Sequence, residues 1–148
     1  MEHTFLFQEG IWIARGYYFD DKDCALPLEG MTRITHMEGL WINIGEMEIK
    51  AGDKSIKFSN RNEIVPFEED KSQTTWESLN PDMGTLLGRF IIVDDTILST
   101  CHAKSGGYTG TEFLLKVSDT HYKNRGVLLK GNDKLSSWSM DLRKASSL

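Results

Sequence analysis

The chain has 148 residues, of which 39% are hydrophobic and 26% are charged, and its 17 Lys and Arg against 22 Asp and Glu give a formal net charge of −5. This length suits one domain with a core of its own, and the composition is that of a globular protein rather than a disordered one. The acidic balance, without any run of Lys or Arg, argues against nucleic acid as a partner, because a phosphate backbone needs a dense cationic face.

The first ten residues have neither a basic start nor an apolar stretch long enough for a secretory signal. No apolar segment approaches the length of a membrane-spanning helix. We therefore expect no membrane partner and a cytoplasmic location.

The two cysteines, Cys24 and Cys101, are too few for a disulfide scaffold and lack the paired spacing of a zinc site. We expect buried free thiols. A single bridge between the two is the alternative for an exported protein.

Strands are favoured over helices along the whole chain, because β-branched and aromatic residues alternate with short polar clusters and no helical period of 3.6 is present. The polar clusters are typical of turns, and the one at 68–71 is expected to form a charged hairpin tip. We expect about ten strands, formed from these eleven segments in chain order: 11–19, 29–36, 40–50, 55–59, 63–67, 73–79, 84–93, 97–103, 109–117, 122–130 and 135–143.

Two parts of the chain resemble each other. Gly10, Arg15 and the pair 20–21 recur as Gly84, Arg89 and the pair 94–95, all at one offset. At a second, longer offset, Lys50, Asp53, Lys54 and Phe58 recur as Lys130, Asp133, Lys134 and Trp138. We interpret residues 1–148 as one domain built from related halves, 10–58 and 84–138, joined by a linking hairpin at 59–83. Convergence on similar turns is the alternative explanation.

The repeat also predicts which side chains point inward, because equivalent positions should share a face of the sheet. The inward sets are expected to be Trp12, Ala14, Gly16 and Tyr18; Leu86, Gly88, Phe90 and Ile92; Trp41, Asn43, Met47 and Ile49; Ile56 and Phe58; and Trp138, Met140 and Leu142. Pairing with the strand at 40–50 adds His121, Val127 and Leu129.

A duplicated antiparallel sheet removes its exposed edges by closing on itself. The predicted fold is therefore all-β, an antiparallel up-and-down barrel of about eight to ten strands, with two packed sheets as the alternative.

Two short segments resemble signatures of the lipocalins, a family of calycin barrels. Residues 10–15, Gly-Ile-Trp-Ile-Ala-Arg, resemble the first-strand Gly-x-Trp signature, with a spacing one residue short. Residues 117–124 are similar to the second signature, with His121 in place of its aspartate. The resemblance implies a calycin-like barrel and suggests ligand binding, and it implies that Arg143 packs on Trp12.

Residues that could carry catalysis or bind a metal are scattered. His36, His102 and His121 fall on different expected strands, and their spacing does not predict a metal site. Cys101 and His102 are adjacent on one expected strand, so their side chains should point to opposite faces. We expect no cofactor, no metal and no catalytic residue.

The favoured hypothesis is a non-enzymatic binding protein that holds a small apolar or aromatic molecule inside the barrel. One alternative is a structural or interaction protein with a packed core, which forms a homodimer through Ile11, Ile13 and Tyr17 on the outer face. The other is an enzyme that uses His121 or His36 as acid or base. The candidate ligand-binding residues are Trp12, Tyr18, Trp41, Asn43, Phe90, His121 and Trp138.

Overall fold

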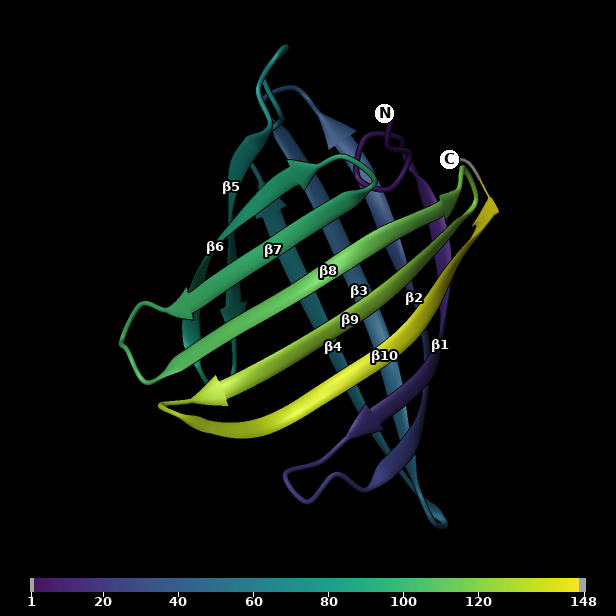
Figure 1. Ribbon diagram of the computed structural model, residues 1–148, viewed down its shortest axis with the longest axis vertical. Helices are drawn as coiled ribbons and strands as arrows, with labels where there is room; N and C mark the ends of the chain where they lie inside the picture. Colours follow the sequence, from purple (N-terminus) through teal and green to yellow (C-terminus); the bar gives the residue numbers. More distant parts are fainter. Residues whose placement is uncertain (1, 147–148) are drawn as a thin grey trace.

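The computed structural model describes residues 2–146 and shows ten antiparallel strands that form one closed barrel (Figure 1). Each strand pairs with its neighbours along the chain, and β1 pairs with β10 to close the ring. The predicted up-and-down antiparallel barrel is therefore confirmed. The strands are β1 (Gly10–Phe19), β2 (Ala25–Met37), β3 (Leu40–Ala51), β4 (Lys54–Ile64), β5 (Gln73–Asn80), β6 (Gly84–Val93), β7 (Thr96–Ala103), β8 (Tyr108–Ser118), β9 (His121–Lys130) and β10 (Asp133–Ser146).

One predicted interruption is absent from the structure. The expected strands at 55–59 and 63–67 are largely one continuous strand, β4, because the polar residues between them pair with β3 like the rest of the strand. Asn60 and Asn62 resemble turn residues in the sequence, but their side chains face the hollow interior of the barrel. The polar residues around Asn60 and Asn62 therefore do not end β4, because its inner face lines a cavity.

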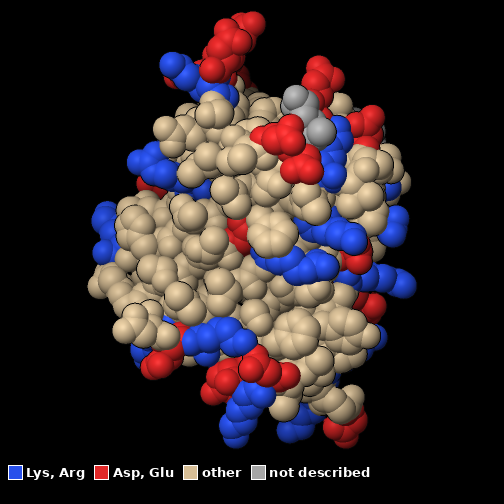
Figure 2. Space-filling model, in the orientation of Figure 1, with Lys and Arg blue, Asp and Glu red and all other residues tan. Residues whose placement is uncertain are grey.

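Within residues 2–146, no helix is long and apolar enough to cross a membrane. The face of the molecule shown in Figure 2 is mixed in charge. On the face shown in Figure 2, Lys and Arg side chains are interspersed with Asp and Glu over the front strands. That face lacks the dense cationic patch that a phosphate backbone requires.

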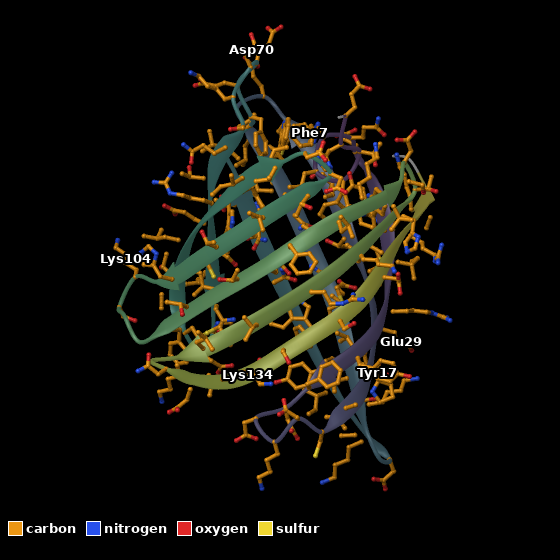
Figure 3. The ribbon with its side chains drawn as sticks, in the orientation of Figure 1. Phe7, Tyr17, Glu29, Asp70, Lys104 and Lys134 are labelled. Atoms are coloured by element: carbon orange, nitrogen blue, oxygen red, sulfur yellow. The ribbon has the colours of Figure 1, made fainter. Side chains whose placement is uncertain are left out.

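The N-terminal segment, residues 3–8, closes one end of the barrel, a role that the sequence did not reveal. Phe7 marks this end in Figure 3, and Tyr17 lies at the other. Phe5 and Leu6 are buried, and a backbone hydrogen bond from Gln8 N to Thr4 O closes the segment into a turn. The apolar side chains of a short loop thus fill the space that the strands leave open.

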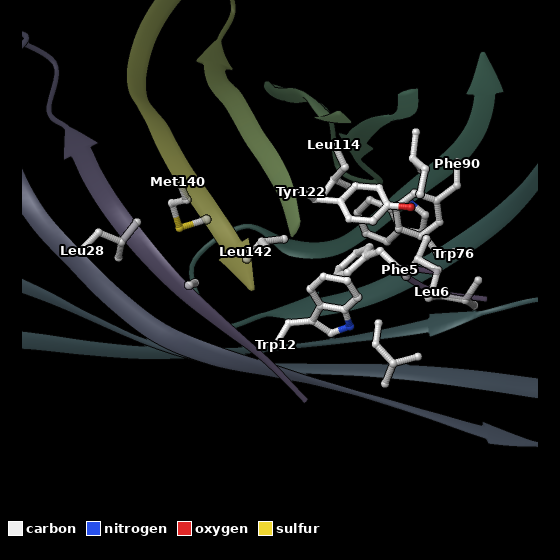
Figure 4. Packing of buried hydrophobic residues seen from close by; sticks show 14 of the residues in the cluster. Phe5, Leu6, Trp12, Leu28, Trp76, Phe90, Leu114, Tyr122, Met140 and Leu142 are labelled. Atoms are coloured by element: carbon white, nitrogen blue, oxygen red, sulfur yellow. The ribbon is translucent and has the colours of Figure 1, made fainter. Parts of the chain in front are cut away.

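An aromatic cluster holds this segment in place (Figure 4). The ring of Phe5 meets Trp12 edge to face at 5.4 Å between centroids, and Trp12 meets Tyr122 in the same way at 5.6 Å. Such edge-to-face pairs add stability beyond that of the buried area. We call the end of the barrel that contains this cluster the closed end.

His3 adds polar contacts to the same cluster. Its Nδ1 lies 2.8 Å from the Tyr122 hydroxyl, and its Nε2 lies 2.8 Å from the backbone oxygen of Asp94. The Tyr122 hydroxyl also accepts the backbone N–H of Thr4 at 3.1 Å. These bonds suit a neutral ring that donates from Nε2 and accepts at Nδ1.

We expect acidification to loosen the N-terminal segment. Desolvation lowers the pKa of His3, and the hydrogen bond to Asp94 opposes this only in part, so the folded chain binds the proton less readily than the unfolded chain. The contribution of His3 is complete above about pH 6.5 and is lost as the pH falls through the lowered pKa.

Amide hydrogen exchange of Leu6 and Phe7, corrected for intrinsic rates and compared with that of β9, should therefore accelerate between neutral pH and about pH 5. A His3→Gln protein, which does not titrate, should lack the acceleration. If the two proteins respond equally to pH, His3 does not control the segment.

The inward faces of β1, β6 and β10 agree with the prediction. Trp12, Ala14 and Phe90 are buried, and Met140 and Leu142 face the interior. The predicted inward face of β9 is wrong. We expected His121, Val127 and Leu129 to point inward, but Tyr122, Asn124 and Leu128 do so.

The physical reason is a difference of one residue between two hairpins. The last pair of the β3–β4 hairpin is Ala51 with Lys54, and the first pair of the β9–β10 hairpin is Lys130 with Asp133. Lys130 is therefore the structural equivalent of Ala51 rather than of Lys50. A shift of one residue exchanges the two faces of a strand.

Candidate functional site

The barrel encloses a cavity of about 830 Å³, within the range of small-molecule sites. Its floor includes Phe5 of the N-terminal segment, and its lining reaches the loop at 80–82 between β5 and β6. The cavity therefore opens at the end opposite the closed end.

Apolar and polar side chains both line the cavity. The apolar lining includes Leu26 and Leu28 of β2, Met47 and Ile49 of β3, Ile56 and Phe58 of β4, and Leu114, Leu128, Met140 and Leu142 of β8–β10. The asparagines of the lining gather on β3, β4 and the adjoining loop, namely Asn43, Asn60, Asn62 and Asn80, with Thr32 beside them. Thr32 donates a hydrogen bond from its hydroxyl to the Asn43 side-chain oxygen. A molecule with both apolar and polar parts matches such a lining.

A carboxylate, Glu112 of β8, lies in the cavity wall with Leu114, Asn124 and Trp138. Its Oε2 accepts hydrogen bonds from Asn124 Nδ2 at 3.1 Å and from Trp138 Nε1 at 3.2 Å. Desolvation raises the pKa of Glu112, and the two hydrogen bonds lower it only in part. Its Oε1 has no hydrogen-bond partner among residues 2–145, and the side chain lines the cavity. This oxygen is available to a ligand that donates a hydrogen bond.

Two glycines keep the tryptophan rings flat against the wall of the barrel. Gly126 pairs directly with Trp138, and Gly88 pairs directly with Trp76. A Cβ at Gly126 would lie 2.1 Å from Trp138 Cζ2, and one at Gly88 would lie 2.0 Å from Trp76 Cε2. Because each ring occupies the space of a missing side chain, it takes less room in the interior.

Four of the candidate residues, Tyr18, Asn43, Phe90 and Trp138, line the cavity together. Two others lie at the closed end, away from the cavity lining. Trp12 belongs to the aromatic cluster there, and Trp41 stacks on His36 with 4.1 Å between ring centroids.

The seventh candidate, His121, lies on the outer surface, where its Nε2 is 2.7 Å from Asp141 Oδ1. The prediction that it faces the interior is wrong. The hydrogen bond to His121 lowers the pKa of Asp141, and the two side chains form a hydrogen-bonded pair on the outer face of the barrel.

Two further expectations are corrected. Cys24 is exposed in the β1–β2 turn rather than buried, and both Cys24 and Cys101 are free thiols. Arg143 is exposed and pairs with Ile13, so it lies on the opposite face of the barrel wall from Trp12 and does not pack on it. Within residues 2–146 no three His, Cys, Asp or Glu side chains are grouped so that they could hold a metal ion.

Sequence reasoning missed Glu112, Asn124 and Thr32. The only available signal for Glu112 was strand alternation, since it lies between Gly110 and Leu114 on one face of β8. A charged residue at such a position is normally assigned to the solvent side, and only the pairing with β9 and β10 shows that it is inside.

Comparisons with known proteins agree with the barrel. A scan against protein-family models finds no match, and a search of curated proteins finds none either. Among solved structures, the chain is similar to the S-type phycobiliprotein lyase CPES from Guillardia theta, with a TM-score of 0.65 and 10% identity over 94% of this chain and 89% of that chain. At this identity the match shows a shared fold alone.

A second similar structure is an AttH candidate from Nitrosomonas europaea. Its TM-score is 0.32, with 11% identity over 95% of this chain and 52% of that chain. A score this low carries no argument about fold or function.

A Gly126→Ala substitution should push Trp138 away from the wall, because the added methyl group overlaps the indole ring. We expect a loss of roughly 1–3 kcal/mol in the free energy of unfolding. The measurement is chemical denaturation. In a Trp138→Leu background, from which the ring is absent, the same Gly126→Ala substitution should cost much less. Equal stability of the Gly126→Ala protein and the original chain would contradict the packing described.

Replacing Glu112 by Gln should stabilise the protein at neutral pH. A carboxyl group with a raised folded pKa costs stability as the pH rises from its unfolded pKa through the folded one, whereas below the unfolded pKa it costs nothing. We expect a gain of roughly 2–4 °C in Tm at neutral pH, corresponding to about 1 kcal/mol in a domain of this size. The gain should disappear near pH 4. Thermal melts at both pH values test this, and a gain that is the same at both would contradict the assignment to ionisation.

Proposed function

We propose that this protein binds a small molecule with an apolar or aromatic body and an N–H donor inside the barrel, without chemically changing it. The observation that carries the proposal is the half-buried carboxylate Glu112, whose second oxygen lines a large open cavity without a hydrogen-bond partner among residues 2–145.

The size and polarity of the cavity support this ligand class. A flat ring system would pack between Trp138 and the leucine and methionine side chains near it, and its polar edge would meet the asparagines opposite. A buried carboxylate favours a partner that donates a hydrogen bond or carries positive charge, because either one offsets its lost hydration. The similar barrel of the phycobiliprotein lyase supports the proposal only at the level of the fold.

The alternatives have less support. The enzyme hypothesis needs a histidine that faces the cavity, but His121 is external, and the Nε2 of His36 is 2.7 Å from the backbone oxygen of Leu6 at the closed end. The interaction hypothesis keeps one observation, since Ile13 and Tyr17 are 39% and 52% exposed on the outer face. Self-association through that face is the outcome that would favour it.

The first test fills the cavity. A Leu128→Trp substitution adds a large ring on the cavity side of β9, whereas Leu129→Trp adds the same ring to the outer side of the same strand. Native mass spectrometry of the original protein should show a retained ligand mass, and Leu128→Trp should abolish it while Leu129→Trp retains it. A ligand-free dimer would instead support the interaction protein.

The second test uses two flat tricyclic probes of opposite charge, proflavine as the cation and anthracene carboxylate as the anion. We expect proflavine to bind more tightly, and a Glu112→Gln substitution to weaken it about tenfold while leaving the anion unaffected or better bound. Fluorescence titration gives both affinities. Proflavine affinity should also fall on acidification, beginning at a higher pH than for an ordinary glutamate because the pKa of Glu112 is raised. Equal affinities of the two probes would contradict a role for Glu112.

A further inference from the structure

The barrel has one poorly sealed seam, between β4 and β5. Eleven residue pairs join β4 to β3, but only three join it to β5: Asn62 with Ser78, Glu63 with Glu77 and Ile64 with Trp76. β5 ends at Asn80, whereas β4 extends back to Lys54. The segment from Lys54 to Arg61 therefore has a strand partner on one edge only.

The backbone groups that point to the open edge can be identified. Val65 donates its N–H to the Thr75 oxygen, on the β5 side. In a regular antiparallel strand, every second residue points to the same neighbour, and the β3–β4 register is regular throughout. The N–H and C=O groups of Ser55, Lys57 and Ser59 therefore point to the unoccupied side, where another strand could pair with them.

The side chains of this edge specify what would fit there. On the cavity side, Ile56 and Phe58 are 54% and 44% exposed beside the opening. The charged residues from Lys54 to Arg61 are three cations and no anion, namely Lys54, Lys57 and Arg61. The acids around this stretch lie at its ends and on β3: Asp53 precedes Lys54, and Glu63 lies 3.8 Å from the Arg61 side chain. On β3, Glu46 and Glu48 lie opposite Ser59 and Lys57. The β5 side of Lys57 has no such acidic strand partner in the pairing of residues 2–146.

We propose that the open edge of β4 is a docking site for an extended acidic segment of another protein, which adds a strand beside the mouth of the cavity. Backbone hydrogen bonds to Lys57 and Ser59 would supply affinity, as in other cases of strand addition. Apolar side chains of the segment would meet Ile56 and Phe58, and alternate acidic side chains would meet Lys57 on the outer face.

A second copy of this chain fits the edge less well. Antiparallel pairing of two β4 edges centred on Lys57 would place the two Lys57 side chains opposite each other, and like charges directly across a strand pair are destabilising. In that register the acid Asp53 of each copy would face Arg61 of the other. The central Lys57 pair thus favours an acidic partner over self-association. This inference is independent of the small-molecule proposal, because it concerns the outer edge of the wall rather than Glu112.

The test uses a synthetic peptide in which Glu alternates with Val, and a matched peptide in which Lys replaces Glu. Fluorescence anisotropy should show binding of the acidic peptide and at least tenfold weaker binding of the basic one. In amide NMR spectra of the full chain, the acidic peptide should perturb Lys57 and Ser59 and slow their hydrogen exchange. Perturbation of another surface, or no difference between the peptides, would overturn the proposal.

Three variants separate the edge from general electrostatics. Lys57→Glu should weaken the acidic peptide about fivefold, since it turns an attractive cross-strand pair into a repulsive one. Lys104→Glu, in the exposed β7–β8 turn, has the same net charge and should leave binding unchanged. Ser59→Pro removes one N–H from the open edge and should also weaken binding about fivefold.

Equal weakening by Lys57→Glu and Lys104→Glu would overturn the proposal, and so would a β4-mediated dimer seen by sedimentation. A Lys57→Ser protein gives one more test. If this protein aggregates and binds no peptide, the proposal would also be overturned, because Lys57 would then serve only to protect an exposed strand edge from aggregation. If Ser59→Pro does not fold, the comparison of the two lysine variants still decides the question.

Discussion

A closed ring of ten strands is wider than its own side chains readily fill, since the diameter of a barrel grows with the number of strands. The interior must therefore be filled by something besides the strands, or remain hollow. This protein does both. The N-terminal segment, with Phe5 and Leu6, fills one end, and the cavity remains at the other. The aromatic cluster around Tyr122 marks the boundary between them (Figure 4).

Contacts between side chains on neighbouring strands keep the cavity open at the hollow end. Trp138 lies over Gly126, and its indole nitrogen is bound to Glu112, so the ring is held against the wall by both packing and a hydrogen bond. Glu112 in turn gains partners that reduce the cost of burying it, without removing that cost. A carboxyl group kept in such a place at a cost in stability is a feature expected of binding sites more than of cores.

The seam between β4 and β5 is another result of the same geometry. β4 is longer than β5, so the end of β4 that projects beyond the neighbouring strand has no partner on one side. This unpaired edge borders the opening of the cavity, where Ile56 and Phe58 are exposed. A molecule that enters the cavity and a chain that pairs with β4 would therefore lie next to each other.

The sequence by itself determined the all-β class, most strand positions and the inward faces of β1, β6 and β10, because alternation and turn chemistry are local properties of the chain. Those faces were enough to place Tyr18, Phe90 and Trp138 beside the interior. Tertiary structure alone decided that residues 3–8 are folded into the closed end, that Glu112 is internal and that His121 is external. The reason is that each of these depends on contacts or register between segments that are distant in the sequence. For His121, a difference of one residue between the β3–β4 and β9–β10 hairpins exchanges the two faces of β9 relative to the predicted pairing with β3. Whether such a barrel is filled or hollow likewise depends on the summed volume of side chains from all ten strands, which no local pattern in the sequence expresses.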